Sequence, residues 1–179
     1  MQKSNIAFIG GRGAGKSRIS RKFGKLSSRL SLSTDTLVCY EAGGIPITKI
    51  VEREGWQGFR DREYALLEKL TAMQNLVIDC GGGILVEAPV SPGEPEQLSA
   101  RKMNLLKNCN VVYVKRDMSW LLDRVSADLN RPDLPGGYRE LLERRLPWYE
   151  KAADFVLDMR GIESDDAIAL LYKKYGKIE

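Results

Sequence analysis

The residues best suited to chemistry lie close together near the start of the chain. Residues 10–17 read Gly-Gly-Arg-Gly-Ala-Gly-Lys-Ser, which fits the phosphate-loop pattern G-x-x-x-x-G-K-[ST]. Glycines let consecutive backbone N–H groups turn inward around phosphate oxygens, and the helix that follows points its N-terminus at the same anion. In such a loop Lys16 reaches the outer phosphates and the Ser17 hydroxyl binds Mg²⁺. The octet therefore predicts a site for a nucleotide and magnesium.

The sequence on either side of the octet supports this interpretation. The run Ile6–Ile9 is short and apolar, as a buried strand requires, and Ile19 and Phe23 follow at helical spacing. A strand before the loop and a helix after it favour a true phosphate loop over the alternative, a glycine-rich turn that matches by chance. We expect the nucleotide to contact Gly11, Gly13, Ala14, Gly15, Lys16 and Ser17.

Strand-like and helix-like runs alternate along the chain, which is typical of an α/β fold with a parallel sheet. We predict one domain, residues 1–179, with a five-stranded parallel sheet flanked by helices. The strands are expected at residues 5–10, 30–33, 75–80, 110–115 and 154–158. The helices are expected at residues 15–28, 35–42, 46–54, 58–73, 96–107, 118–129, 138–152 and 164–175. Ser164, with two aspartates behind it, is a good start for the last helix.

Two stretches are predicted to be mobile loops. Residues 87–97 are rich in proline and acid, and we expect them to pack poorly. Residues 130–137 lie between two predicted helices and contain Arg131 before Pro132. A closing lid could carry Arg131 over the phosphates, and Arg124, one helical segment earlier, could stack on a base. For each arginine alone, an ordinary surface position is the better supported interpretation.

Three further features come at the carboxyl ends of predicted strands, where an open α/β sheet binds its ligands. Asp35 follows the second strand and should project into that crevice; its alternative is to serve only as a helix N-cap. Gly81-Gly82-Gly83 follows the third strand, which indicates that a ligand or a backbone segment comes very close, or else a sharp turn. Asp79 closes an apolar run, in the manner of an aspartate that holds Mg²⁺ in nucleotide sites.

Two arginines lie on otherwise apolar helical stripes. Arg60 shares its stripe with Trp56, Tyr64 and Leu67, and Arg145 shares its own with Tyr138, Leu141, Leu142 and Tyr149. Such arginines need an anionic partner, so two of them suggest a bidentate clamp for a carboxylate or phosphate. The alternatives are an ion pair of Arg60 with Glu63 alone and a solvated Arg145 head on a packed stem. Pro147 is expected to disturb the helix just past Arg145.

Composition narrows the class of protein. The chain has 179 residues, 43% of them hydrophobic, and a net charge of only +4, which is weak evidence for nucleic-acid binding. It has no histidine, which excludes Ser-His-Asp triads and histidine metal sites. Cys39, Cys80 and Cys109 lack the spacing of a zinc site or a disulfide framework, so reduced thiols are expected. Without a long apolar run or room for a signal peptide, we expect a cytoplasmic monomer that binds neither membrane nor nucleic acid.

Together the motifs resemble the shikimate kinase family, small P-loop kinases related to the nucleoside monophosphate kinases. The resemblance runs in order from Ile6 to about Ile168. The phosphate loop is similar to the family's nucleotide loop, and Asp35 to the second acid of its D-[ST]-D motif. Gly58-Phe59-Arg60 with Glu63 is similar to G-F-R-x-x-E, and Gly81–Gly83 to a triple glycine. Further matches are Arg124 to an arginine near the adenine, Arg131-Pro132 to R-P of the lid, and Arg145-Leu146-Pro147-Trp148-Tyr149 to R-x-P-x-Y.

The resemblance implies a P-loop kinase fold with a lid and an ATP- and Mg²⁺-dependent enzyme that phosphorylates the 3-hydroxyl of shikimate, a step in aromatic amino acid biosynthesis. It implies catalytic roles for Lys16, Asp35 and Arg131, with Asp35 binding the hydroxyl. It implies that Arg60 and Arg145 hold the substrate carboxylate and that Gly82 is the nearest of the three glycines. The substrate-binding segment would be about residues 34–62 and the lid about 124–138.

The chain departs from the family pattern in three places. Ser33 replaces the first acid of D-[ST]-D, which in the family helps to hold magnesium through water. Asp79 stands where the family usually has a small residue, and our hypothesis is that it supplies the missing charge, so that Ser17, Ser33 and Asp79 form the metal site. The segment after the triple glycine is longer than the family's, because of residues 87–97.

Two other functions stay open at this point. The residues by themselves indicate only a small hydroxylated carboxylate as substrate, so a P-loop kinase for another metabolite, such as gluconate or a nucleotide, is one alternative. A shikimate kinase-like protein that binds ligands without catalysis is the other, and Ser33 is the feature that favours it.

Overall fold

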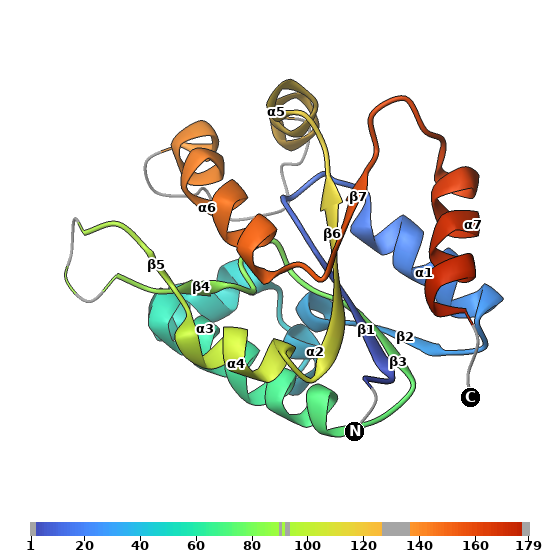
Figure 1. Ribbon diagram of the computed structural model, residues 1–179. Helices are drawn as coiled ribbons and strands as arrows, with labels where there is room; N and C mark the ends of the chain where they lie inside the picture. Colours follow the sequence, from blue (N-terminus) through green and yellow to red (C-terminus); the bar gives the residue numbers. More distant parts are fainter. Residues whose placement is uncertain (1–2, 90, 92–93, 127–136, 177–179) are drawn as a thin grey trace.

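Five short apolar runs form the strands of one parallel sheet in the computed structural model, which describes residues 3–89, 91, 94–126 and 137–176. The strands are β1 (Asn5–Ile9), β2 (Leu30–Ser33), β3 (Leu76–Asp79), β6 (Cys109–Lys115) and β7 (Phe155–Asp158). They lie in the order β2-β3-β1-β6-β7, and every neighbouring pair is parallel (Figure 1). The predicted five-stranded parallel sheet is therefore confirmed, with each strand at or next to its predicted bounds.

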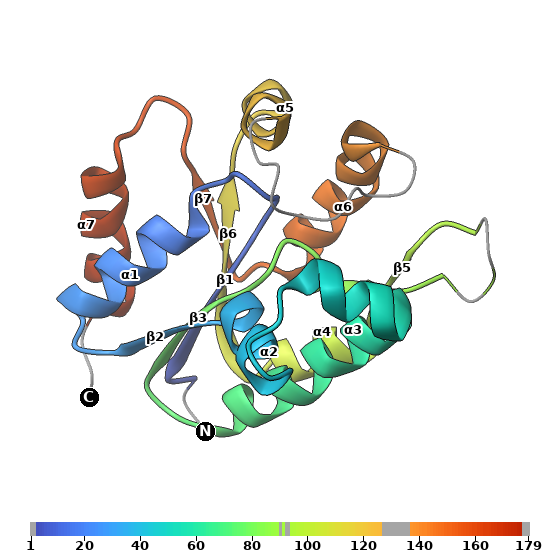
Figure 2. The same ribbon diagram turned by 180° about the vertical axis from the view of Figure 1, so that it is seen from behind.

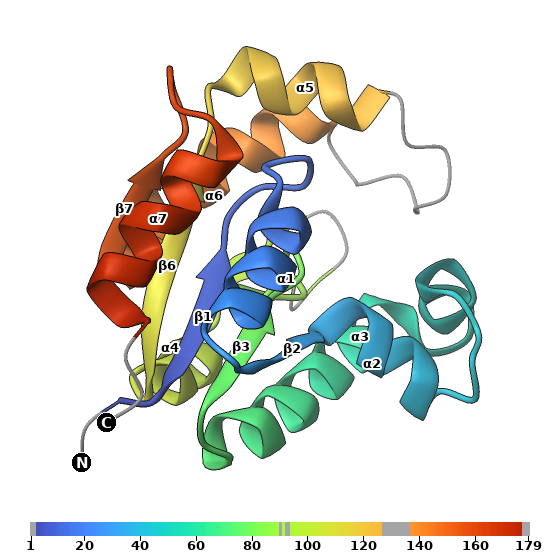
Figure 3. The same ribbon diagram turned by 90° about the vertical axis from the view of Figure 1, so that its right-hand side faces the viewer.

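Alternation along the strands sends side chains into two separate cores. Ile6 and Phe8 of β1 pack with α1 (Lys16–Leu26) and α7 (Ser164–Tyr175). Ala7 and Ile9 pack on the other face with α3 (Ile47–Ala72) and α4 (Ala100–Leu106). Figures 1 and 3 show these two pairs of helices on opposite faces of the sheet. Because the strands are parallel, their carboxyl ends all meet at one edge, where a ligand crevice is expected.

The helices follow the predicted pattern, with shifted ends. α2 (Thr34–Glu41) has Ser33 rather than Asp35 as its N-cap, since the Ser33 hydroxyl accepts a hydrogen bond from the Thr36 N–H at 3.4 Å. α3 joins two predicted helices, and Gly55, with φ of 70°, marks the break between them. α4 starts at Ala100 instead of residue 96 because Ser99 caps it. Within the described part of the chain, no helix is both long and apolar enough to cross a membrane.

The last three helices correct details of the prediction. α5 (Met118–Ser126) is the start of the predicted helix 118–129, whose end lies outside the described residues. α6 (Tyr138–Ala152) continues through Pro147, so the expected disturbance there is wrong. The helical turn after Pro147 is stabilised by packing in the core, where the ring centroid of Tyr149 lies 5.4 Å from that of Tyr113 on β6. α7 starts at Ser164, but its N-cap is Glu163, and no side chain caps it.

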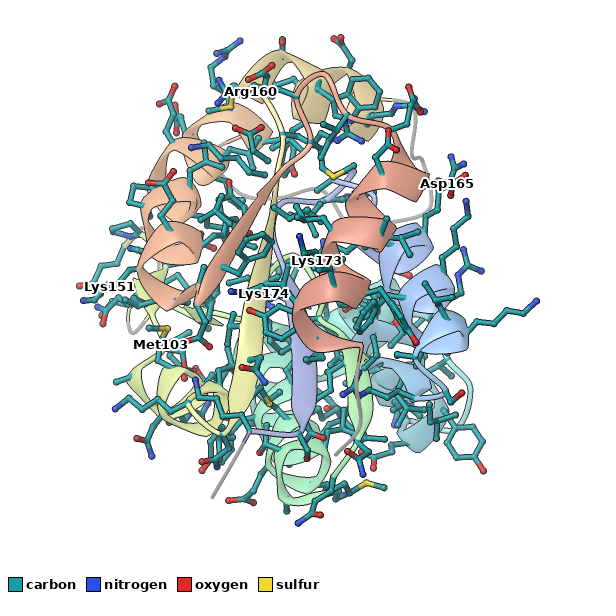
Figure 4. The ribbon with its side chains drawn as sticks, turned by 45° about the vertical axis from the view of Figure 1, so that its right-hand side comes forward. Met103, Lys151, Arg160, Asp165, Lys173 and Lys174 are labelled. Atoms are coloured by element: carbon teal, nitrogen blue, oxygen red, sulfur yellow. The ribbon has the colours of Figure 1, made fainter. Side chains whose placement is uncertain are left out.

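Charge instead of a cap supports the two ends of α7. Asp165 lies in its first turn, and Lys173 and Lys174 lie in its last (Figure 4). Acids at the amino end and bases at the carboxyl end oppose the partial charges of the helix dipole.

A small antiparallel hairpin, absent from the prediction, follows the triple glycine. β4 (Val86–Glu87) pairs with β5 (Gln97–Leu98), so that Val86 lies opposite Leu98 and Glu87 opposite Gln97. Figure 2 shows this hairpin beside α3 and away from the main sheet. The ends of the loop predicted at residues 87–97 are thus held by backbone pairing, and the expectation of poor packing is wrong for them.

Asn5 provides a test of how α3 is tied to the sheet. Its side-chain amide donates to the Met73 carbonyl at 2.7 Å, and its side-chain oxygen accepts from the buried Leu76 N–H at 2.9 Å. Asn5→Ala would leave that N–H buried and unpaired, so we expect the free energy of unfolding in urea to fall by about 2–3 kcal/mol. Asn110→Ala removes a single 2.8 Å bond to Lys3 and should cost about 1 kcal/mol. Equal losses in the two variants would contradict this role for Asn5.

Candidate active site

The predicted phosphate loop turns sharply between β1 and α1. Gly10 has φ of 142°, and a Cβ there would lie 2.7 Å from the Val114 carbonyl oxygen, so glycine is required. Gly15, with φ of 91°, is the N-cap of α1. The loop therefore ends with the amino end of α1 at the carboxyl edge of the sheet, a geometry that favours an anion.

Lys16 lies folded across this loop. Its Nζ donates hydrogen bonds to the carbonyl oxygens of Gly10 and Gly11, each at 3.0 Å, and the side chain is buried. The ammonium group is thereby held beside the backbone that would surround a phosphate. Ser17 follows in the first turn of α1 and is exposed.

A cavity of about 450 Å³ opens beside the loop. Its walls combine the phosphate loop, the carboxyl ends of β2 and β3, one side of α5 with the residue Arg116 before it, and the start of α7. The lining residues are Arg12–Ile19, Ser33, Asp35, Asp79–Gly82, Arg116, Trp120, Arg124 and Ser164. The guanidinium carbons of Arg116 and Arg124 lie 4.6 and 4.8 Å from the ring centroid of Trp120. A partly exposed indole with two cations offers stacking and charge to a nucleotide base and its phosphates.

The three glycines after β3 bring acidic and basic side chains against the backbone. A Cβ at Gly81 would overlap the carboxylate of Asp35, and a Cβ at Gly83 would overlap the guanidinium of Arg60. The Gly81 N–H also donates to the Thr34 hydroxyl at 2.8 Å, which ties this segment to the start of α2. At Gly82 the neighbour is backbone, because a Cβ there would lie 3.2 Å from the Arg12 nitrogen. Both side chains and the backbone of the phosphate loop therefore make the close approach that the sequence indicated.

A second cavity, of about 60 Å³, adjoins the first. Arg12, Asp35 and Gly82 line both cavities. The remaining lining is mostly aromatic or charged, with one isoleucine and one glycine: Ile47, Trp56, Phe59, Arg60, Glu63, Gly83, Tyr138 and Arg145. Sites for organic ligands usually measure about 300 Å³ or more, so part of this lining has to shift when a ligand enters.

Arg60 reaches the second cavity from α3. Its Nη1 donates to Glu63 Oε2 at 2.6 Å, and Lys102 Nζ on α4 lies 3.2 Å from the same oxygen. All three side chains are buried, and Lys102 is fully inaccessible. Burial lowers the pKa of Lys102, and the nearby Glu63 carboxylate opposes that shift. One carboxylate balances two cations here, so the group keeps a positive charge that suits an anionic ligand.

Arg145 reaches the same cavity from α6. Its Nε and Nη2 each donate at 2.6 Å to the carboxylate of Glu96, and its Nη1 donates to the Gly82 carbonyl at 3.3 Å. Burial disfavours the charged guanidinium, but the Glu96 hydrogen bonds and nearby negative groups outweigh it and raise the pKa of Arg145. The side chain is only 6% exposed, so the alternative of a solvated head is wrong. The two arginines from separate helices line one cavity.

Oxygen ligands gather where β2 and β3 end. Ser33 and Asp79 are direct partners in the register of these strands, and both line the first cavity with Ser17. Mg²⁺ prefers oxygen ligands and is usually held by one or two carboxylates together with phosphate oxygens, so these residues fit it. The described residues contain no group of three acidic, histidine or cysteine side chains suited to a metal. The nucleotide would therefore have to supply part of the coordination.

Several residues of the site carried no sequence signal that we used. Arg12 is a variable position of the phosphate-loop pattern, yet it lines both cavities, and its carbonyl accepts from the Tyr138 hydroxyl at 2.9 Å. Lys102, Arg116 and Trp120 lie on helices or loops without a motif. Arg131 and most of the predicted lid lie outside the described residues. The catalytic role of Arg131 and the closure of the lid therefore stay predictions.

Comparison with known proteins identifies the family. The sequence profile named "Shikimate kinase" matches residues 12–174. The chain belongs to the shikimate kinase family. A shikimate kinase of Leptospira biflexa is 45% identical over 166 residues, which cover 91% of each chain. One of Leptospira borgpetersenii is 37% identical over 177 residues, covering 96% of this chain and 98% of the relative.

A solved structure agrees with this assignment. Shikimate kinase from Acinetobacter baumannii, in complex with shikimate, matches with a TM-score of 0.81 and 29% identity, over 98% of this chain and 96% of that one. Shikimate kinases use ATP with Mg²⁺, so the cofactors expected from the sequence are those of the family.

Glu63→Gln tests the shared ion pair of this shikimate kinase family member. The change leaves Arg60 and Lys102 buried without a counter-charge, so we expect the free energy of unfolding in urea to fall by about 3–5 kcal/mol. Glu68→Gln, at an exposed position on the same helix, should change it by less than about 0.5 kcal/mol. A loss at Glu63 no larger than that at Glu68 would show that the group is not held by this carboxylate.

Proposed function

We propose that this shikimate kinase transfers the γ-phosphate of ATP to the 3-hydroxyl of shikimate, in the passage between its two cavities. One observation carries the proposal. Two buried arginines, Arg60 and Arg145, line a cavity that joins the phosphate-loop cavity at Asp35. One path thus leads from Arg60 and Arg145, which can clamp a carboxylate, past Asp35, which can bind a hydroxyl, to the loop that can bind phosphates. Membership in the family is independent support.

The residues of the first cavity would hold the donor. The loop amides and Lys16 would bind the β- and γ-phosphates, and Arg124 with Trp120 would stack on the base. Magnesium would neutralise phosphate charge, and Ser17 would bind it, with waters on Ser33 or Asp79. Arg131, arriving with the lid, would stabilise charge on the transferring group.

The residues of the second cavity would hold the acceptor. Arg60 and Arg145 would bind the carboxylate of shikimate, and their fixed positions would convert binding into orientation of the ring. Asp35 would accept a hydrogen bond from the hydroxyl, turn its oxygen toward the γ-phosphate and take up its proton. Gly81–Gly83 would let the ring lie against the backbone, with Gly82 nearest to it.

The proposal also includes a monomer of one domain, residues 1–179, in the cytoplasm. Cys80 and Cys109 are buried thiols outside any disulfide, which suits a reducing compartment.

Release of ADP with ATP and Mg²⁺ tests the proposal directly. We expect release that depends on shikimate and not on quinate, gluconate or nucleoside monophosphates. Asp35→Asn should lower kcat by roughly 10²–10⁴-fold because it removes the proton acceptor. Arg60→Ala should lower kcat/KM by about 100-fold through loss of orientation. Arg139→Ala, which removes an exposed arginine on α6, is the control and should leave both unchanged.

The other outcomes are equally informative. Release with a different acceptor would keep the kinase and replace the substrate. ATP binding without release for any acceptor would favour the ligand-binding alternative, which the serine at position 33 motivates.

Asp79→Asn tests the hypothesis that Asp79 replaces the acid lost at Ser33. Loss of the charge should raise the Mg²⁺ concentration for half-maximal activity about ten-fold or more, measured by magnesium titration at fixed ATP. Ser33→Asp, which restores the acid of the family pattern on the neighbouring strand, should be tolerated. Unchanged magnesium dependence in Asp79→Asn would rule the hypothesis out.

A further inference from the structure

Glu96 forms a buried ion pair with an arginine of the proposed substrate clamp. Its two carboxylate oxygens accept from Nε and Nη2 of Arg145, both at 2.6 Å. The side chains of Glu96 and Arg145 are 11% and 6% exposed. Charge-assisted bidentate pairs of this kind fix the plane of a guanidinium as well as its position. No family motif named above includes Glu96, which lies within residues 87–97, the segment that the sequence analysis expects to lengthen the chain after the triple glycine.

The hairpin that carries Glu96 is anchored at its base. Glu87 on β4 accepts from Arg101 Nε at 2.7 Å and Nη2 at 2.8 Å, and also from the Ser99 hydroxyl. Arg101 in turn donates to Asp61 on α3 at 2.6 Å. Glu96 directly precedes β5, so these contacts hold its backbone close to the site.

The hydrogen bonds of Arg145 leave its other edge available for a ligand. An arginine side chain has five N–H donors. Among the contacts with described residues, Glu96 takes one donor from Nε and one from Nη2, and the Gly82 carbonyl takes one from Nη1. The Tyr149 hydroxyl is a further hydrogen-bonding neighbour of the guanidinium, so one terminal N–H is left over for an oxygen of a carboxylate.

Glu96 itself lies off the cavity. The described lining of the second cavity includes Arg145 but not Glu96. The carboxylate therefore holds the guanidinium from the side, where it does not occupy the place of a substrate. Glu63 stands in the same relation to Arg60, except that Glu63 also touches the cavity.

We propose that Glu96 is a positioning residue for phosphoryl transfer, which holds Arg145 so that its remaining N–H donor faces the substrate carboxylate. The inference rests on the proposed function. The pair of Arg145 with Glu96 is neutral, so the attraction for a carboxylate comes from Arg60, Lys102 and Glu63, which together keep one positive charge. Orientation, not attraction, is what Glu96 contributes.

If Glu96 contributes orientation and not attraction, its loss should change kcat. Removing a negative charge strengthens binding of substrate and transition state alike, which changes KM and leaves the barrier from the bound state unaltered. A guanidinium free to rotate lets the substrate ring tilt, so the hydroxyl leaves its line with the γ-phosphate and the chemical step slows.

The test is single-turnover phosphorylation of shikimate by the full chain at saturating ATP and Mg²⁺. Glu96→Ala should lower the rate about ten-fold or more, while the Kd for ATP stays unchanged. Glu96→Gln keeps the shape and one acceptor oxygen, so it should fold normally and lose less activity. Glu94→Ala, at an exposed position of the same loop, is the matched control and should behave as wild type. In an Arg145→Ala background, the further change Glu96→Ala should have no additional effect, because Glu96 acts through Arg145.

Four results would overturn the inference. A lower KM with an unchanged rate would mean that Glu96 competes with the substrate for Arg145. A lower melting temperature with an unchanged rate would mean that the ion pair is only structural. A wild-type protein without shikimate-dependent turnover would overturn the proposed function and this inference with it, whereas an active wild type matched by Glu96→Ala would overturn the inference alone.

Discussion

The site depends on a stretch of chain that has no side chains. At Gly81–Gly83 the backbone leaves β3 and passes against Asp35 and Arg60 at distances that a Cβ would not allow. The same stretch is held from the opposite side, because the Gly82 carbonyl accepts hydrogen bonds from Tyr149 and Arg145 on α6. Residues from α2, α3 and α6 are thus positioned by one turn. The position of one cavity relative to the other is therefore set by the backbone of this turn, which moves less than long side chains do.

Buried charge is the second constraint, and it explains why the substrate end of the site is so densely paired. Desolvating an ion costs several kcal/mol, so each buried cation needs a partner close by. Arg145 has Glu96, while Arg60 and Lys102 share Glu63. The arrangement is neutral except for one charge. Such a cluster adds little stability compared with apolar side chains of the same volume, although removing one partner is costly. It discriminates in favour of a ligand that brings one negative charge to this place.

The sequence predicted the parts of the molecule whose signals are local. Apolar runs and the spacing in Gly10–Ser17 identify the strands and the loop, and helical spacing turns Arg60 and Arg145 inward. The missed parts depend on residues far apart in the chain. No spacing rule links Glu96 to Arg145, which lies 49 residues away, and strands of two residues have no period to detect. The helix propensity of Pro147 alone predicts a break in α6, but the packing of Tyr149 in the core keeps the chain helical beyond it.

The tryptophans are distributed so that the protein can report on its own occupancy. Trp120 lines the first cavity beside Arg116 and Arg124, and Trp56 lines the second cavity, with its ring centroid 5.3 Å from the guanidinium carbon of Arg60. Trp148 packs against the core instead. Indole emission responds to nearby charge and water, so each ligand changes the surroundings of a different fluorophore. Variants that keep a single tryptophan therefore separate the two binding events optically, and stopped-flow traces from them give the order in which donor and acceptor arrive.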